Sequence, residues 1–133
     1  MIAHLLYDQE GWKVHAIVRK NSLNLPLLEH LRSLSSGRLA LHYGDVTDTF
    51  FVFSLIKLVA PDHIYNFAAQ SHVGHSFVNP MVTYETNTKG LMIICESLLK
   101  LSKVDCKVFH ASTSEMYGDQ PIPVSDFSES SPF

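Results

Sequence analysis

The stretch that decides the fold runs from Asp48 to Phe67 and reads Asp-Thr-Phe-Phe-Val-Phe-Ser-Leu-Ile-Lys-Leu-Val-Ala-Pro-Asp-His-Ile-Tyr-Asn-Phe. Apolar residues recur at helical spacing over residues 49–59, and Asp48 stands where a helix N-cap is expected. A Pro-Asp pair then interrupts the helix, and residues 63–67 have the character of a buried strand. The stretch therefore predicts a helix that leads directly into a strand.

The same alternation extends along the rest of the chain. We expect further strands at residues 14–18, 39–43 and 107–111, and further helices at residues 2–10 and 84–101. Strands that alternate with helices indicate the α/β class, here a Rossmann-like doubly wound parallel sheet with helices on both faces. Ligands of such sheets bind beyond the carboxyl ends of the strands, so the residues that come after each strand are the most informative.

The composition fits one globular domain and argues against several classes of function. The 133 residues are 46% hydrophobic and 17% charged, and the net charge of −3 offers no basic surface for nucleic acid. No apolar run approaches the roughly 18 residues of a membrane span. The two cysteines, Cys95 and Cys106, have neither metal-site nor disulfide spacing. We expect a reduced, cytoplasmic protein without nucleic-acid or membrane partners.

Cationic and short polar residues come after the strand at 14–18. Arg19, Lys20, Asn21 and Ser22 stand where an NAD-binding fold usually places an acidic residue, and an Arg there suits the 2′-phosphate of NADP. These residues predict an NADP pocket, and a solvated basic loop is the alternative. After the next strand, Asp45 can accept a hydrogen bond from an adenine amino group, although a turn and a helix cap explain most of that segment.

Two alanines come directly after the strand at 63–67. Ala68 and Ala69 allow the backbone to approach a large planar or phosphorylated ligand, and tight packing of a helix on the sheet is the alternative. Ser71 and His72 supply hydrogen-bonding groups beside them. His72 and His75 also raise the question of zinc, but no Cys, Asp or Glu nearby completes a ligand set, so we expect no metal site.

Hydroxyl groups and a carboxylate come after the strand at 107–111, in the sequence Ser-Thr-Ser-Glu-Met-Tyr-Gly. This is the usual place for acid–base chemistry in this class of fold. Thr113 and Glu115 lie two residues apart, so an extended backbone would point both side chains the same way. The alternative is an ordinary Ser/Thr turn in which Glu115 caps the next segment of the chain.

Three segments together resemble the GDP-mannose 4,6-dehydratase family of the extended short-chain dehydrogenase/reductase superfamily. They are residues 41–45, residues 65–73 with Ser76 and Phe77, and residues 111–118, in family order and spacing. The resemblance implies a lyase of GDP-fucose biosynthesis that converts GDP-mannose to GDP-4-keto-6-deoxymannose with NADP, NAD being the less favoured cofactor. Other nucleotide-sugar dehydratases, epimerases and decarboxylases share the looser elements and are the alternative.

The resemblance also implies roles for single residues. Glu115 matches the general base that removes the C5 proton and protonates the departing C6 hydroxyl, and Thr113 matches a residue that hydrogen-bonds the sugar O4. Ser71 matches a position that also faces the substrate. The positions that match cofactor contacts are Arg19, Lys20, Asn21, Ser22, Asp45, Val46, Phe67, Ala68, Ala69, Gln70 and Ser71. A departure lies at Val82, where the family commonly has a Tyr near the cofactor.

The family pattern is incomplete in this sequence. No two of the six glycines lie three residues apart, as the pyrophosphate-binding fingerprint requires, and no Tyr is followed by a Lys four residues later. We therefore expect residues 1–133 to be a partial Rossmann domain without its first strand, its Gly-rich loop and its C-terminal substrate part. That first strand is central in the order 3-2-1-4-5, so the sheet should split into two pieces with unpaired edges.

A chain without its central strand is expected to be unstable or to aggregate, and to bind NADP without high affinity. The loss of several buried strand residues, at about 2 kcal/mol each, exceeds the stability of a typical domain. Two hypotheses therefore compete. The chain is part of a nucleotide-sugar dehydratase whose family forms homo-oligomers, or it is a short non-catalytic product that docks to a full-length relative.

Overall fold

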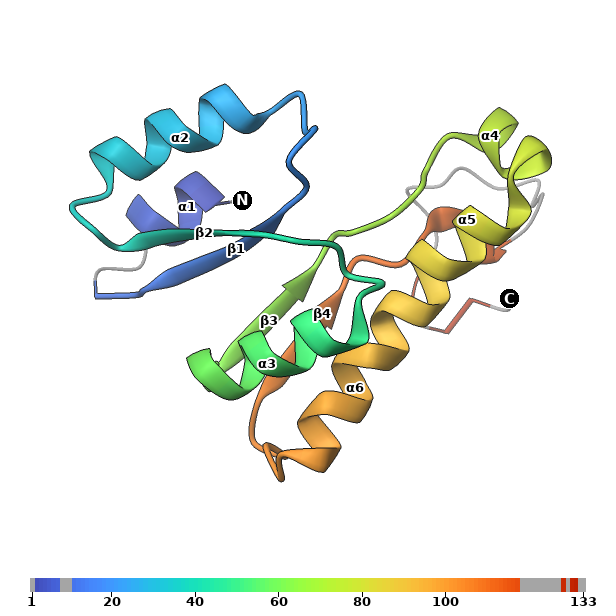
Figure 1. The fold of residues 1–133 in the computed structure, drawn as a ribbon. Coiled ribbons are helices and arrows are strands. Elements are labelled where there is room, and N and C mark those ends of the chain that lie inside the picture. Colours follow the sequence, from blue (N-terminus) through green and yellow to red (C-terminus); the bar gives the residue numbers. More distant parts are fainter. Residues whose placement is uncertain (1, 8–10, 118–127, 129, 132–133) are drawn as a thin grey trace.

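A computed structural model describes residues 2–7, 11–117, 128 and 130–131 (Figure 1). Its elements, in chain order, are α1 (Ile2–Tyr7), β1 (Val14–Val18), α2 (Leu25–Leu34), β2 (Leu39–Tyr43), α3 (Thr49–Val59), β3 (His63–Asn66), α4 (Val73–Val78), α5 (Pro80–Tyr84), the π-helical segment η1 (Glu85–Lys89), α6 (Gly90–Lys100), β4 (Lys107–His110) and the 3-10 turn η2 (Ser114–Tyr117). The predicted bounds of β1, β2 and α3 are confirmed. The strands β3 and β4 each end one residue earlier than predicted, and part of the helix predicted at 2–10 lies outside the described residues.

The four described strands form two separate parallel pairs. β1 pairs with β2, with Val14 opposite Leu39, and β3 pairs with β4, with His63 opposite Lys107. Within the described part of the chain no strand joins the two pairs. The α/β class is confirmed, and so is the predicted division of the sheet into two pieces.

Each strand pair has a small hydrophobic core of its own. The core of the first half consists of Leu6, Val14 and Leu39. The core of the second half consists of Val52, Ile56, Ile93, Ile94 and Leu98, where α3 and α6 pack together. Burial of apolar surface, the main favourable contribution to folding, is thus divided between two centres.

The helix α3 begins and ends where the sequence predicts. The Asp48 carboxylate accepts a hydrogen bond from the Phe51 backbone N–H at 3.0 Å, which pairs one of the free donors of the first turn. The helix ends at Ala60, whose φ of 48° turns the chain away. A Cβ at Gly44 would overlap the Phe51 ring, so only glycine lets this helix approach the end of β2 so closely.

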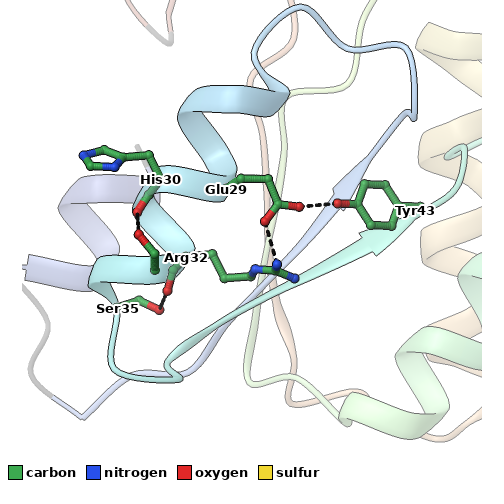
Figure 2. A network of polar contacts seen from close by, with 6 residues as sticks. Glu29, His30, Arg32, Ser35 and Tyr43 are labelled. Atoms are coloured by element: carbon green, nitrogen blue, oxygen red, sulfur yellow. Dashed lines mark hydrogen bonds and ion pairs between the residues drawn. The ribbon is translucent and has the colours of Figure 1, made fainter.

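Three helices, α2, α4 and α5, were not predicted from the sequence. α2 is joined to β2 by polar contacts, because the Tyr43 hydroxyl donates to the Glu29 carboxylate at 2.5 Å (Figure 2). Glu29 also pairs with Arg32 at 2.7 Å. The hydrogen bond to Glu29 raises the pKa of Tyr43 above its ordinary value, since it favours the protonated phenol. This network fixes the position of α2 beside the carboxyl end of β2.

The single helix predicted at residues 84–101 is instead the last residue of α5, the π-helical segment η1 and the helix α6. α5 ends at Tyr84, η1 comes next as a π-helical turn, and α6 begins at Gly90. A π-helical turn breaks the regular helical period and is often found at functional sites. None of the described helices is long and apolar enough to cross a membrane.

Candidate functional site

A cleft of about 670 Å³ lies at the carboxyl ends of β1 and β3. Arg19 comes directly after β1, and Ala69 to Ser71 come after β3, so the cleft is lined from both strand pairs. The other described lining residues are His72, Gly74, His75, Val78, Val82 and Thr86. This crevice beyond the strand ends is where doubly wound sheets bind ligands.

The structure brings together only some of the predicted site residues. Arg19, Ala69, Gln70 and Ser71 line the cleft, as does Val82, the position at which the sequence departs from the family. The predicted residues Lys20, Asn21, Ser22, Asp45, Val46, Phe67, Ala68 and Thr113 are not among its described lining residues. Glu115 lies in η2, and its side chain lies outside what the structure describes.

The loop after β3 is held by Gln70, which makes five hydrogen bonds within the site. Its backbone N–H donates to the Asn87 side-chain oxygen at 2.7 Å, and the Asn87 amide donates back to the Gln70 carbonyl at 3.0 Å. Its side-chain amide donates to the Thr83 hydroxyl at 3.1 Å. Its side-chain oxygen accepts the His72 N–H at 2.6 Å. Gln70 therefore builds the loop that forms one wall of the cleft.

A buried asparagine joins the carboxyl ends of β3 and β4. Asn66 is 5% exposed, and its side-chain oxygen accepts the Ala68 backbone N–H at 3.1 Å. Its amide nitrogen lies 3.2 Å from Nδ1 of His110, the last residue of β4. A buried polar group needs such partners, and these partners fix the start of the loop after β3 relative to β4.

Three positioning residues, Asn66, Thr83 and Asn87, were not identified from the sequence. Asn87 lies in the run Glu-Thr-Asn-Thr-Lys, inside a stretch that helical periodicity describes well. Five successive polar residues before an apolar helix were the available signal, because Thr and Asn are poor helix formers. Periodicity alone cannot show that Asn87 bonds a loop 17 residues earlier in the chain.

The segment after β1 forms a turn. The Ser22 N–H donates to the Arg19 carbonyl at 3.0 Å, and the Ser22 hydroxyl accepts the Asn24 N–H at 3.4 Å. The turn leaves Arg19 at the carboxyl end of β1, where it reaches the cleft. The Ser22 hydroxyl has a local structural role in addition to any contact with a ligand.

The segment after β2 also has a local structural explanation. Oδ1 of Asp45 accepts hydrogen bonds from the backbone N–H and the hydroxyl of Thr47, at 3.0 and 2.9 Å. Val46 packs against Gly90, where a Cβ would lie 3.2 Å from the Val46 side chain. The turn that was the alternative explanation for Asp45 is therefore present. Val46 packs this turn against the first residue of α6.

The prediction of an extended backbone through Thr113 and Glu115 is wrong. Glu115 lies in η2, and Ser112 has a φ of 56°, which turns the chain immediately after β4. The Met116 N–H then points to the Thr113 carbonyl at 3.5 Å. A turn forms in this segment, as in the alternative left open by the sequence, and the capping role of Glu115 in that alternative stays a prediction. Left-handed conformations are uncommon for residues other than glycine and are enriched at functional sites.

The two histidines of the cleft take part in the start of α4. Nδ1 of His72 accepts the His75 backbone N–H at 3.2 Å, so His72 caps the helix. Among the described residues there is no group of three His, Cys, Asp or Glu side chains placed to hold a metal ion.

The charge of the cleft suits an anionic ligand. Its described lining contains Arg19 and two histidines and no carboxylate. An Arg side chain is the favoured partner of a phosphate group because its guanidinium donates several hydrogen bonds in one plane. The site therefore has room and charge for a phosphorylated cofactor. A second hollow of about 370 Å³ is lined by α3 and α6 residues such as Phe50 and Ile93.

Comparisons with known proteins agree with this geometry. The family model described as GDP-mannose 4,6 dehydratase matches residues 1–133. The chain is 38% identical to GDP-mannose 4,6 dehydratase 2 of Caenorhabditis elegans over an alignment of 133 positions, which covers 94% of this chain and 35% of that protein. It is 39% identical to the GDP-mannose 4,6-dehydratase of Sinorhizobium fredii over an alignment of 128 positions, which covers 92% of this chain and 36% of that protein. The chain thus spans about a third of the length of these curated relatives.

Solved structures share the fold. The UDP-Glc/GlcNAc 4-epimerase of Campylobacter jejuni matches 98% of this chain and 37% of its own chain, with a TM-score of 0.81 and 23% identity. DesIV, a dTDP-glucose 4,6-dehydratase of Streptomyces venezuelae solved with NAD and TYD bound, matches 98% and 38%, with a TM-score of 0.79 and 27% identity. Both strand pairs of this chain therefore superpose together on complete Rossmann-like proteins.

Proposed function

This chain belongs to the GDP-mannose 4,6 dehydratase family, and from this premise we propose that it forms part of the cofactor and substrate site of an enzyme that converts GDP-mannose to GDP-4-keto-6-deoxymannose. One observation carries the proposal. Arg19, from the end of β1, and residues 69–71, from the end of β3, line one cleft without carboxylates among its described lining residues. Such a cleft suits a phosphorylated dinucleotide.

The cofactor of this proposal is a nicotinamide dinucleotide, with NADP favoured over NAD. Arg19 binds the 2′-phosphate, with Lys20, Asn21 and Ser22 in the adjoining turn. The backbone of residues 67–71 lies against the dinucleotide, held in place by Asn66 and Asn87. The dinucleotide supplies the hydride acceptor and later the hydride donor. DesIV was solved with NAD, which supports a nicotinamide cofactor in this fold.

The proposed chemistry of this chain centres on the segment after β4. Thr113 hydrogen-bonds the sugar O4 and polarises the ketone that forms at C4. The ketone acidifies the C5 proton, which Glu115 removes and then delivers to the C6 hydroxyl, so that water leaves. Ser71 contacts the sugar from the loop after β3. The sequence has no Tyr-x-x-x-Lys pair, so in this proposal the base for the C4 hydroxyl belongs to polypeptide outside residues 1–133.

The test is a chimera in which this chain replaces the matching segment of the Sinorhizobium fredii enzyme. We expect the chimera to bind NADP and to release a 4-keto-6-deoxy sugar nucleotide from GDP-mannose. The same chimera with Glu115→Gln should bind NADP normally and lose most of its turnover. A folded chimera that binds NADP but does not turn over GDP-mannose would contradict the proposal, as would full activity of the Glu115→Gln variant.

A second candidate is an enzyme for another nucleotide sugar. The observation in favour of this candidate is the 27% identity to DesIV, a dTDP-glucose 4,6-dehydratase. Parallel assays of the chimera with dTDP-glucose and with UDP-glucose separate the candidates, with the unmodified Sinorhizobium fredii enzyme as control. Turnover of either sugar above that of GDP-mannose would favour the second candidate.

A further inference from the structure

The last residues of β3 and β4, Asn66 and His110, are partners in the register of the two strands, so their side chains lie on the same face of the pair. The amide nitrogen of Asn66 lies 3.2 Å from Nδ1 of the His110 ring. Asn66 is buried and His110 is half-buried. The Asn66 amide is thus shielded from water, and its N–H groups need an acceptor within the protein.

The orientation of the Asn66 amide is fixed by its second partner. Its oxygen Oδ1 accepts the Ala68 backbone N–H at 3.1 Å, and a backbone N–H can only donate. A flipped amide would turn its own NH2 group toward the Ala68 N–H, so that two donors would face each other. The NH2 group therefore faces His110, whose Nδ1 accepts the hydrogen bond, and the proton of the neutral ring is on Nε2.

This pair of side chains stands between the two segments that carry the proposed site. Through Oδ1, Asn66 holds Ala68 in the segment 67–71, which lies against the dinucleotide in the proposed function. His110 directly precedes the segment 111–115, which contains both groups proposed for the chemistry on the sugar. The Asn66–His110 contact therefore sets the start of one segment relative to the start of the other.

A second contact joins the same two parts of the chain on the opposite face of β4. The rings of Phe67 and Phe109 have centroids 5.7 Å apart, with their planes 36° from parallel. Both rings are about half exposed. Contacts between aromatic rings tolerate a range of offsets, whereas a hydrogen bond is restricted in both distance and angle. The ring contact therefore holds the two segments near each other, and the Asn66–His110 hydrogen bond determines their register.

We infer that His110 is a positioning residue: its Nδ1 holds the Asn66 amide in the orientation that binds Ala68, and so keeps the segment 67–71 in register with the segment 111–115. This inference rests on the proposed function, in which the first segment contacts the dinucleotide and the second contacts the sugar. Hydride transfer between the two ligands needs their reacting atoms about 3–3.5 Å apart and aligned. His110 touches neither ligand in this role and acts through Asn66.

The first test measures turnover of GDP-mannose by variants of the chimera with the Sinorhizobium fredii enzyme. His110→Phe keeps an aromatic ring and removes the acceptor, so kcat should fall about tenfold or more, while KM and the Kd for NADP stay within about twofold. His110→Asn keeps an acceptor at the γ position and should restore kcat to within about threefold of the parent. Phe109→Leu, which trims the ring contact only, is the control. An equal loss of kcat in His110→Asn or in Phe109→Leu would overturn the inference.

The second test needs no turnover, so it separates failure of this inference from failure of the proposed function. In the chimera with ¹⁵N-labelled histidine, His110 should show an unprotonated Nδ1 and a protonated Nε2. Hydrogen exchange of the Ala68 amide should be slow in the parent and in His110→Asn, and about tenfold faster in His110→Phe. A protonated Nδ1, or equal exchange in the three proteins, would overturn the inference. Both signatures in a chimera without turnover would support the contact and contradict the proposed function.

Discussion

The side chain of Asn87 pairs with both backbone polar groups of Gln70, accepting from its N–H at 2.7 Å and donating to its carbonyl at 3.0 Å. A side-chain amide can pair with the N–H and the C=O of one residue, as a neighbouring strand would, because it carries an acceptor oxygen and two donor hydrogens. The relationship joins the π-helical turn η1 to the loop that forms a wall of the cleft. The shape of the proposed cofactor site thus depends on a residue that is not among its described lining residues.

Replacement of Asn87 should therefore weaken cofactor binding. Asn87→Ala leaves both backbone groups of Gln70 without their partner, and a loss of about tenfold in NADP affinity is expected. Asn87→Asp keeps the acceptor and should lie between Asn87→Ala and the parent chain. The measurement is an NMR titration of the chain, which also detects weak binding. Thr88→Ala, at an exposed position of the same turn, is the control, and an equal loss in that variant would contradict the assignment.

Replacement of Arg19 should change the preference between cofactors. If Arg19 binds the 2′-phosphate, Arg19→Ala weakens NADP binding about tenfold or more and leaves NAD binding within about twofold. Lys20 lies in the same turn but not among the described residues that line the cleft, so Lys20→Ala should have the smaller effect. Parallel titrations with both dinucleotides measure the ratio. An equal loss for NADP and NAD would show that Arg19 acts on the loop rather than on the phosphate.

Replacement of Gly44 should destabilise the chain through Phe51. A Cβ at Gly44 would overlap the Phe51 ring, and forcing such a contact costs about 1–3 kcal/mol of unfolding free energy. In Gly44→Ala combined with Phe51→Ala the overlap is gone, so the two substitutions should be strongly non-additive. Urea unfolding of the four proteins of this cycle gives the interaction energy. If the changes in unfolding free energy of the two single variants simply add, the prediction that the Gly44 side chain strains the Phe51 ring is wrong.

Protonation of His15 should destabilise the chain at low pH. Nδ1 of His15 lies 2.9 Å from Nε2 of His42, with the two rings 13° from parallel and their centroids 5.1 Å apart. These values describe rings side by side and joined by an in-plane hydrogen bond, which needs at least one neutral ring. Burial, followed by the charges of His42 and Lys13, lowers the pKa of His15 below 6.5.

The sign of the pH effect is set by that lowered pKa. Below pH 6.5 the unfolded chain binds more protons at this position than the folded chain, so the free energy of unfolding falls as the pH is lowered through the folded pKa. Above pH 6.5 the contribution is fully present. Urea midpoints between about pH 7.5 and pH 5 should fall less for His15→Gln than for the parent chain. A fall of the same size in both proteins would place the titrating group elsewhere.

The sequence predicted those parts of the structure whose causes are local. β1, β2 and α3 were predicted to the residue because apolar periodicity and the Asp48 cap act within a few positions. The cleft was predicted in part, since ligands of this fold lie beyond strand ends. The loop-building role of Gln70 was not predicted, because it depends on Asn87 and Thr83 in another element. The geometry at Glu115 was predicted wrongly, because nothing in a Ser-Thr-Ser run signals the left-handed backbone of Ser112.

The separation of the chain into two cores has a consequence for the order of folding. In the first half, β1 pairs with β2 within residues 14–43. In the second half, β3 pairs with β4 within residues 63–110. Neither half needs a strand from the other, so the first can form while the second is still being synthesised. Short loop closures of this kind favour rapid local folding.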